Sequence, residues 1–176
     1  MHLHIQLRYR AGARAVAAML ANPEYGRARV AASGATAHQV DVTGEPDGAF
    51  TVTSRRSMPT DQIPPNLRSL VGSSLEVRQI EAWDEPGSGG RRGTVVVEIF
   101  GAPVRLTGTT SLQPDDDAED GADASVLTYD GEVKAGVRLF GAAIEEAAAR
   151  AVRAGLESEQ QAGNRWLDGH PDGRST

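Results

Sequence analysis

The stretch VLTYDGEVKAGVRLFGAAIEEAAARAV, Val126–Val152, carries two periodicities with almost no loop between them. In its first half, apolar residues such as Tyr129 and Val133 alternate with charged ones, which indicates a half-buried β-strand. Its second half is rich in alanine and predicts a helix. We therefore expect a strand over 127–137 that leads almost directly into a helix over 140–167.

The predicted helix is amphipathic, and the middle of its apolar face is built from small residues. Ala148, Ala151 and Gly155 lie where a close-packed core would place leucine or isoleucine. A glycine inside a helix costs about 1 kcal/mol relative to alanine, so its presence calls for a reason. Two reasons remain open: a close approach of helix to sheet, or an unfilled space that holds a ligand.

Glu159 is the only charged residue near the centre of this apolar face. A carboxylate there is costly unless it is paired, protonated or in contact with a wet pocket. Because Glu159 lies towards the end of the helix, it could also reach solvent or pair with an arginine. The sequence therefore makes Glu159 a candidate pocket residue and leaves these alternatives open.

The chain before the opening stretch predicts one strand, two short helices and a run of further strands. His2–Tyr9 alternates cleanly, and Ala13–Ala21 and Pro23–Ala32 are helical in composition. A short helical segment is also expected over 60–71. The remaining strands are expected over residues 36–43, 50–58, 75–83, 94–100 and 104–112.

Alternation within the strand over 75–83 slips near Gln79 and Ile80, which predicts a β-bulge. Consecutive strands joined by hairpin turns, with the helices segregated to one face, indicate an α+β fold with an antiparallel sheet. A sheet of about seven strands has an apolar face that another element must cover, and the last helix is the only predicted element long enough to do so. We therefore expect that helix to cover the apolar face of the sheet.

Composition limits the possible functions. A chain of 176 residues predicts one domain, here over 1–168, followed by a disordered polar tail over 169–176. The net charge of −6 argues against a nucleic-acid partner. The absence of cysteine excludes disulfides and thiol nucleophiles. Without an apolar run long enough to span a membrane or an apolar leader, we expect a cytoplasmic protein, monomeric or homodimeric, without membrane insertion.

No motif of known chemistry is present. The acidic run over 115–123 does not match the ligand spacing of a calcium loop, and indicates a solvated charged hairpin tip. His2 and His4 share a strand face, but two ligands do not make a metal site. Nucleophile elbows and phosphate-binding loops are also missing. We therefore predict no catalytic residue, no metal site and no cofactor.

Several polar residues are expected at inward-facing strand positions: His38, Ser54, Arg56, Thr110 and Tyr129. Such groups could orient a mostly apolar ligand, or they could be hydrogen-bonded within the core. The predicted ligand-binding set combines three of them with residues of the last helix: His38, Arg56, Tyr129, Ala148, Val152, Gly155 and Glu159.

The run VKAGVRLFGAAIEEAAARAVRAGLESEQQAGNRWL, with Gly141, Glu145 and Trp166–Leu167, resembles the C-terminal signature of a family of uncharacterised, mainly actinobacterial proteins (domain of unknown function 2505). LEVRQIEAW and GAPVRLTGTTSLQP resemble its middle strands. That family is similar to the START and birch-pollen-allergen (SRPBCC) superfamily. The resemblance implies a helix-grip fold, in which a seven-stranded antiparallel sheet wraps around one long C-terminal helix.

The same resemblance implies ligand binding without naming a ligand or a catalytic residue. Our first hypothesis is a non-enzymatic protein that binds or carries a small apolar or lipid-like molecule between sheet and helix. A second is a cyclase- or hydrolase-like enzyme that uses His38, Arg56, Tyr129 or Glu159 as acid, base or oxyanion partner. A third is a protein-interaction module whose apolar face binds another chain.

Overall fold

The computed structural model describes residues 1–60, 74–102, 104–118, 123–136, 141–170 and 172–173. Within this part of the chain, seven strands and three helices form. In chain order they are β1 (His2–Tyr9), α1 (Ala13–Leu20), α2 (Pro23–Ala32), β2 (Ala37–Gly44), β3 (Phe50–Pro59), β4 (Ser74–Trp83), β5 (Arg91–Phe100), β6 (Val104–Pro114), β7 (Ser125–Ala135) and α4 (Gly141–Gly169).

All seven strands belong to one antiparallel sheet in the order β1-β7-β6-β5-β4-β3-β2. Each of β2 to β6 pairs with the strand that follows it in sequence, and β1 pairs with β7. The alternation seen in the sequence matches burial, since every second residue of β1 is buried. The predicted α+β fold with a seven-stranded antiparallel sheet is confirmed.

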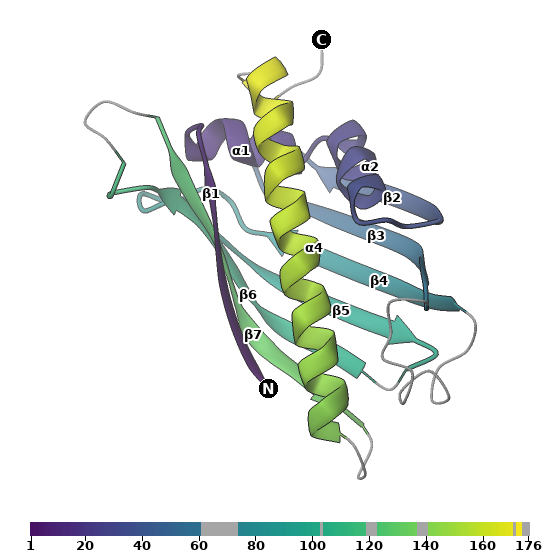
Figure 1. The fold of residues 1–176 in the computed structure, drawn as a ribbon. Coiled ribbons are helices and arrows are strands. Elements are labelled where there is room, and N and C mark those ends of the chain that lie inside the picture. The colour runs from purple at the N-terminus through teal and green to yellow at the C-terminus, as the bar shows by residue number, and fades with distance from the viewer. Residues whose placement is uncertain (61–73, 103, 119–122, 137–140, 171, 174–176) are drawn as a thin grey trace.

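The long helix α4 crosses the concave face of the curved sheet, as Figure 1 shows. Helices α1 and α2 lie beside its C-terminal half and contact it there. The predicted helix-grip arrangement is therefore confirmed, including the two short helices after the first strand. At the start of α2, the Asn22 side chain accepts a hydrogen bond from the Glu24 amide at 2.8 Å, which satisfies one of the free amides of the first turn.

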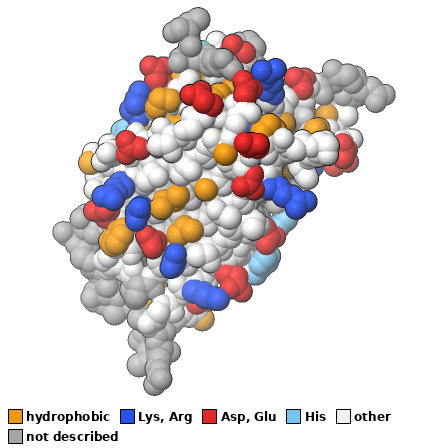
Figure 2. Space-filling view, turned by 180° about the vertical axis from the view of Figure 1, so that it is seen from behind, with side chains coloured by type: hydrophobic (Ala, Val, Ile, Leu, Met, Phe, Trp, Pro, Cys, Tyr) orange, Lys and Arg blue, Asp and Glu red, His pale blue; other side chains and the backbone are white. Residues whose placement is uncertain are grey.

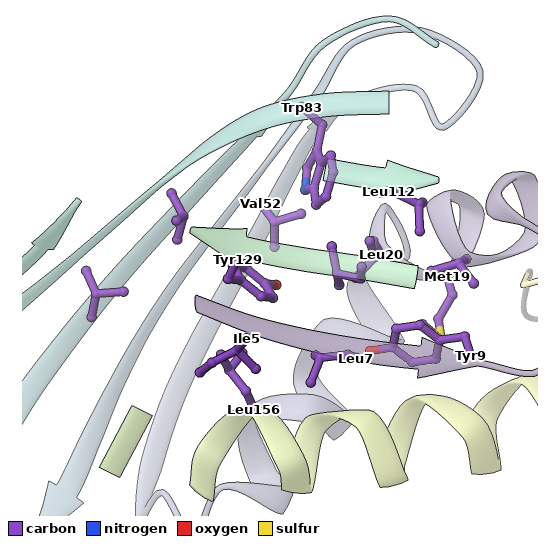
Figure 3. Close-up of a cluster of buried hydrophobic side chains, with 14 of the residues drawn as sticks. Ile5, Leu7, Tyr9, Met19, Leu20, Val52, Trp83, Leu112, Tyr129 and Leu156 are labelled. Carbon is purple, nitrogen blue, oxygen red and sulfur yellow. The ribbon is translucent and has the colours of Figure 1, made fainter. Parts of the chain in front are cut away.

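The C-terminal half of α4 is tightly packed. A Cβ atom on Gly163 would lie 2.6 Å from Cε1 of Tyr9 and 3.0 Å from the hydroxyl of Tyr25. Only glycine lets the helix approach β1 and α2 this closely. The surrounding core includes Met19 and Leu112, both fully buried, and Figure 3 shows these side chains gathered with Tyr9 between the sheet and the helices.

The predicted bulge near Gln79 and Ile80 is wrong. Pairing of β4 with β3 and with β5 runs without interruption through both residues. Gln79 and Glu81 are buried on the inner side of the strand, in the same alternating series as Val77 and Trp83. Polar residues at inward positions produced the apparent slip in the pattern.

Several element boundaries differ by one to three residues from those predicted. Strand β7 ends at Ala135 rather than at residue 137, and residues 137–140, where the strand-to-helix connection was expected, lie outside the described residues. A short helical segment was expected over 60–71, and its residues 61–71 also lie outside the described residues. The buried face of α4 is rotated from the predicted one, since Ala149 and Gly163 are buried.

Part of the predicted polar tail packs against the helix end. Helix α4 continues to Gly169. The His170 ring stacks on Trp166, with ring centroids 4.3 Å apart. The Trp166 indole nitrogen donates a hydrogen bond of 3.3 Å to the carbonyl of Gly173, which is buried.

The described helices include none with the length and apolar character needed to cross a membrane. On the outer side of the sheet, Figure 2 shows acidic and basic side chains with hydrophobic ones scattered among them. Among the described residues, the large hydrophobic side chains left exposed are those of Met1 and Phe100.

Candidate ligand-binding cavity

A cavity of about 550 Å³ lies between the sheet and the N-terminal half of α4. This volume is within the range of about 300–1,000 Å³ found for small-molecule sites. Its walls are mostly apolar. They include Met58 (β3), Val77 (β4), Val95, Val97 and Ile99 (β5), Val104 and Leu106 (β6), and Ile144, Ala148, Val152 and Leu156 (α4).

The small residues of α4 leave this space open. A Cβ atom on Gly155 would meet nothing within 4 Å, in contrast to the crowded surroundings of Gly163. Gly155 therefore does not serve close packing of the helix on the sheet. Of the two explanations that the sequence left open for the small residues, the structure supports an unfilled space.

Six of the seven predicted site residues line the cavity: Arg56, Tyr129, Ala148, Val152, Gly155 and Glu159. His38 does not. It pairs across the sheet with Arg56 and so shares its face, but it is exposed and belongs to β2, the edge strand. The expected face of His38 is correct, whereas its place in the cavity is not, because an edge position near a strand end is left uncovered.

Glu159 belongs to a buried charged cluster that meets one end of the cavity. Arg29 of α2 lies 3.1 Å (Nη1–Oε1) from Glu81 of β4 and 3.8 Å (Nη1–Oε2) from Glu159. All three residues are at most 3% exposed. Of the alternatives weighed for Glu159, two apply together, since it is paired with an arginine and lines the cavity.

A chain of hydrogen bonds links this cluster to the cavity wall. Arg56 donates from Nη2 to the Gln79 side-chain oxygen at 3.2 Å, and the Gln79 amide donates to Oε1 of Glu81 at 2.6 Å. The same Glu81 oxygen faces Arg29. Residues from β3, β4, α2 and α4 are thereby joined into one polar network behind an apolar chamber.

Burial and charge act in opposite directions on the pKa values in this network. Burial raises the pKa of Glu159, and Arg29 and Arg56 only partly offset the effect. Burial lowers the pKa of Arg56 despite the nearby Glu159. Burial by itself also lowers the pKa of Arg29, but Glu81 and Glu159 outweigh it and hold that pKa well above its usual value.

Some buried polar atoms have no hydrogen-bond partner within the described part of the chain. On the cavity wall these are Nη1 of Arg56 and the hydroxyl of Tyr129. Ser54 and Thr110, predicted to face inward, are buried and their hydroxyls are likewise unpartnered there. Buried polar groups are normally hydrogen-bonded, so the two on the wall are suited to contact a ligand.

Sequence reasoning missed Arg29, Gln79 and Glu81. Arg29 gave no signal, because arginine on a short helix is usually a surface residue. Gln79 and Glu81 did give one, since the slip in alternation along β4 marked polar residues at inward positions. If the strand is assumed to be unbroken, the alternation places Gln79 and Glu81 on the same inward face as Val77.

A metal site is not formed by the described residues, among which no cluster of three or more metal-ligating side chains occurs. His4 instead lies 2.9 Å (Nδ1–Oδ2) from Asp130 on the outer side of the sheet, with His2 3.6 Å away (Nε2–Oδ2) from the same oxygen.

The family model described as "Protein of unknown function (DUF2505)" matches residues 4–167. The chain belongs to this family. The resemblance seen in the C-terminal run and the middle strands is thus confirmed for the DUF2505 protein described here. A search of curated proteins finds no match.

Solved structures resemble this DUF2505 chain in fold at low sequence identity. A START superfamily protein from Mycobacterium smegmatis has a TM-score of 0.55 at 13% identity, with 96% of this chain and 98% of that chain covered. An aromatase/cyclase from Streptomyces sp. R1128 has a TM-score of 0.54 at 15% identity, covering 96% and 92%. Norcoclaurine synthase from Thalictrum flavum, solved with dopamine and hydroxybenzaldehyde, has a TM-score of 0.56 at 13% identity, with 100% of this chain and 89% of that chain covered. These matches show the fold, and the predicted likeness to the START superfamily is confirmed at that level.

Proposed function

We propose that this chain is a binding or carrier protein for a small apolar or lipid-like molecule held between the sheet and α4. One observation carries the proposal: a cavity of about 550 Å³ with mostly apolar walls, beside a helix whose Gly155 has open space where a side chain would be. A cavity of this size left empty would cost stability in proportion to its volume. A bound apolar molecule would remove that cost by burying its own surface.

The test is uptake of a neutral apolar dye, N-phenyl-naphthylamine, followed by its fluorescence. The wild-type protein should bind the dye, and Gly155→Leu should abolish or strongly weaken binding, because the leucine side chain enters the cavity. Melting temperature of the variant should stay close to that of the wild type, since nothing lies within 4 Å of the new Cβ.

Glu157→Leu is the matched control, since it adds the same side chain to an exposed position two residues away. It should leave dye binding unchanged. Absence of dye binding by the wild type, or equal binding by wild type and Gly155→Leu, would contradict the proposal. If the dye test succeeds, lipid extraction and native mass spectrometry of protein purified from its own host would identify the natural ligand.

An enzyme acting in the same cavity is the second candidate. It is favoured by the polar groups on the wall: the unpartnered Tyr129 hydroxyl, Arg56, and Glu159 with its raised pKa. Groups with displaced pKa values in a cleft are candidates for acid–base chemistry. Two of the proteins with a similar fold are described as a synthase and an aromatase/cyclase. Turnover lost in Tyr129→Phe or Glu159→Gln, with dye binding retained, would support this candidate.

A protein-interaction module has less support. It would need a large exposed apolar surface. In the described residues, Met1 and Phe100 are the exposed large hydrophobic side chains.

A further inference from the structure

Arg56 is a charged group on the cavity wall that forms no direct ion pair with a described carboxylate. Its guanidinium donates from Nη2 to the neutral side-chain oxygen of Gln79. Its Nη1 is buried and has no hydrogen-bond partner among the described residues, and Glu159 and Glu81 act on Arg56 without a direct ion pair. A buried cation without an anionic partner is costly.

The carboxylates nearest to this region are engaged elsewhere. Both Glu81 and Glu159 face Arg29, which thus has two carboxylate partners while Arg56 has none in the described structure. The arrangement leaves one guanidinium facing the cavity with donor capacity to spare. The complementary group on a ligand is an oxygen acceptor that carries negative charge.

We infer that the ligand of this cavity is an amphipathic monocarboxylate, with its carboxylate on Arg56 and its apolar body along α4. The inference rests on the proposed binding function and adds the chemical class of the ligand. Guanidinium and carboxylate match in shape and charge, and such pairs are among the strongest hydrogen-bonded contacts in proteins. The other walls of the cavity are mostly apolar and include Val97, Ile99 and Ile144, the last on the first turn of α4.

A neutral molecule of the same length would fill the same apolar space but leave the Arg56 charge unmatched. The site should therefore discriminate by charge at one end and tolerate variation along the apolar body. Glu159 also lines the cavity, where it is paired with Arg29 and burial raises its pKa.

Displacement of bound N-phenyl-naphthylamine by dodecanoate and by n-dodecanol at neutral pH tests the inference. The two probes share an alkyl chain and differ at the polar end. Wild type should bind dodecanoate at least about tenfold more tightly, in line with the effect of truncating one partner of a buried charge pair. Equal affinity for both probes would overturn the inference while leaving the proposed function intact. Failure of the dye and of both probes to bind would instead overturn the proposed function.

Arg56→Gln should weaken dodecanoate binding by about tenfold or more and leave n-dodecanol binding within about twofold. The control is Arg55→Gln, an exposed neighbour on the opposite face of β3, which should change neither affinity. An unchanged preference for dodecanoate in Arg56→Gln would overturn the role of Arg56. Because the comparison of two probes on the wild type needs no variant, the inference stays testable even where Arg56→Gln folds poorly.

Discussion

Arg29 of α2 and Glu81 of β4 form an ion pair of 3.1 Å in the interior, with Glu81 fully buried. The pair joins a short helix to the middle of the sheet and positions Glu159 at the end of the cavity. A buried ion pair can stabilise a fold less than an apolar pair would, but breaking it on one side leaves an unmatched charge. The pair therefore makes the α2 end of the molecule sensitive to single substitutions.

Arg29→Met should destabilise the protein by about 3–5 kcal/mol, because Glu81 and Glu159 lose their shared cation inside the core. Urea unfolding followed by circular dichroism measures the change. The double variant Arg29→Met/Glu81→Leu should lose less than the single one. Lys134→Met is the control, since it removes a pair with Glu132 at the exposed surface, and should leave the unfolding curve nearly unchanged. A double variant less stable than Arg29→Met would contradict this account.

Two glycines of α4 should respond oppositely to alanine. Gly163→Ala should destabilise by about 1–3 kcal/mol, because the added methyl group meets Tyr9 and Tyr25. Gly155→Ala should stabilise by up to about 1 kcal/mol, since it improves helix propensity and enters open space. Thermal unfolding of both variants beside the wild type measures the difference. Similar losses in both would show that the helix packs tightly along its whole length.

Stability should depend on pH through Glu159. Burial raises the pKa of Glu159 in the folded state above the ordinary value of 4.5. Between these two pKa values, the folded state therefore holds a proton that the unfolded state has released. The free energy of unfolding, compared with that of Glu159→Gln, should therefore fall as pH rises from about 4.5 through the higher folded pKa. Urea titrations at a series of pH values measure this difference. A constant difference across that window would contradict the assignment.

Glu145 should stabilise the junction of β7 and α4. Its Oε1 accepts a hydrogen bond of 3.0 Å from the Ala135 amide, and this bond lowers the pKa of Glu145. In Glu145→Ala that amide should exchange with deuterium faster, as measured by hydrogen exchange with NMR. The control is Glu146→Ala, which removes only the surface pair with Arg150. Equal exchange rates in both variants would remove Glu145 from this role.

The fold followed from periodicity, whereas the site followed only in part. Alternation along β1 and the amphipathic pattern of α4 report burial directly, so they located both elements. Gly155 and Glu159 could be placed on the cavity wall because each is unusual on an apolar helix face. The prediction that His38 lines the cavity was wrong, because a strand pattern gives the face on which a residue lies but not whether another element packs over it. Arg29 could not be found, because its partners Glu81 and Glu159 are distant in sequence and meet it only in the folded chain.

Gly155 and Gly163 are eight residues apart on α4, roughly 12 Å along its axis, yet one faces a void and the other touches aromatic rings. Under the proposed binding function, substitutions near residue 155 should alter what the cavity can hold, whereas substitutions near residue 163 should alter the stability of the fold. Natural selection can act on these two properties separately along a single helix. Under the proposed binding function, changes in the first half of α4 would alter the ligand while the second half keeps the fold intact.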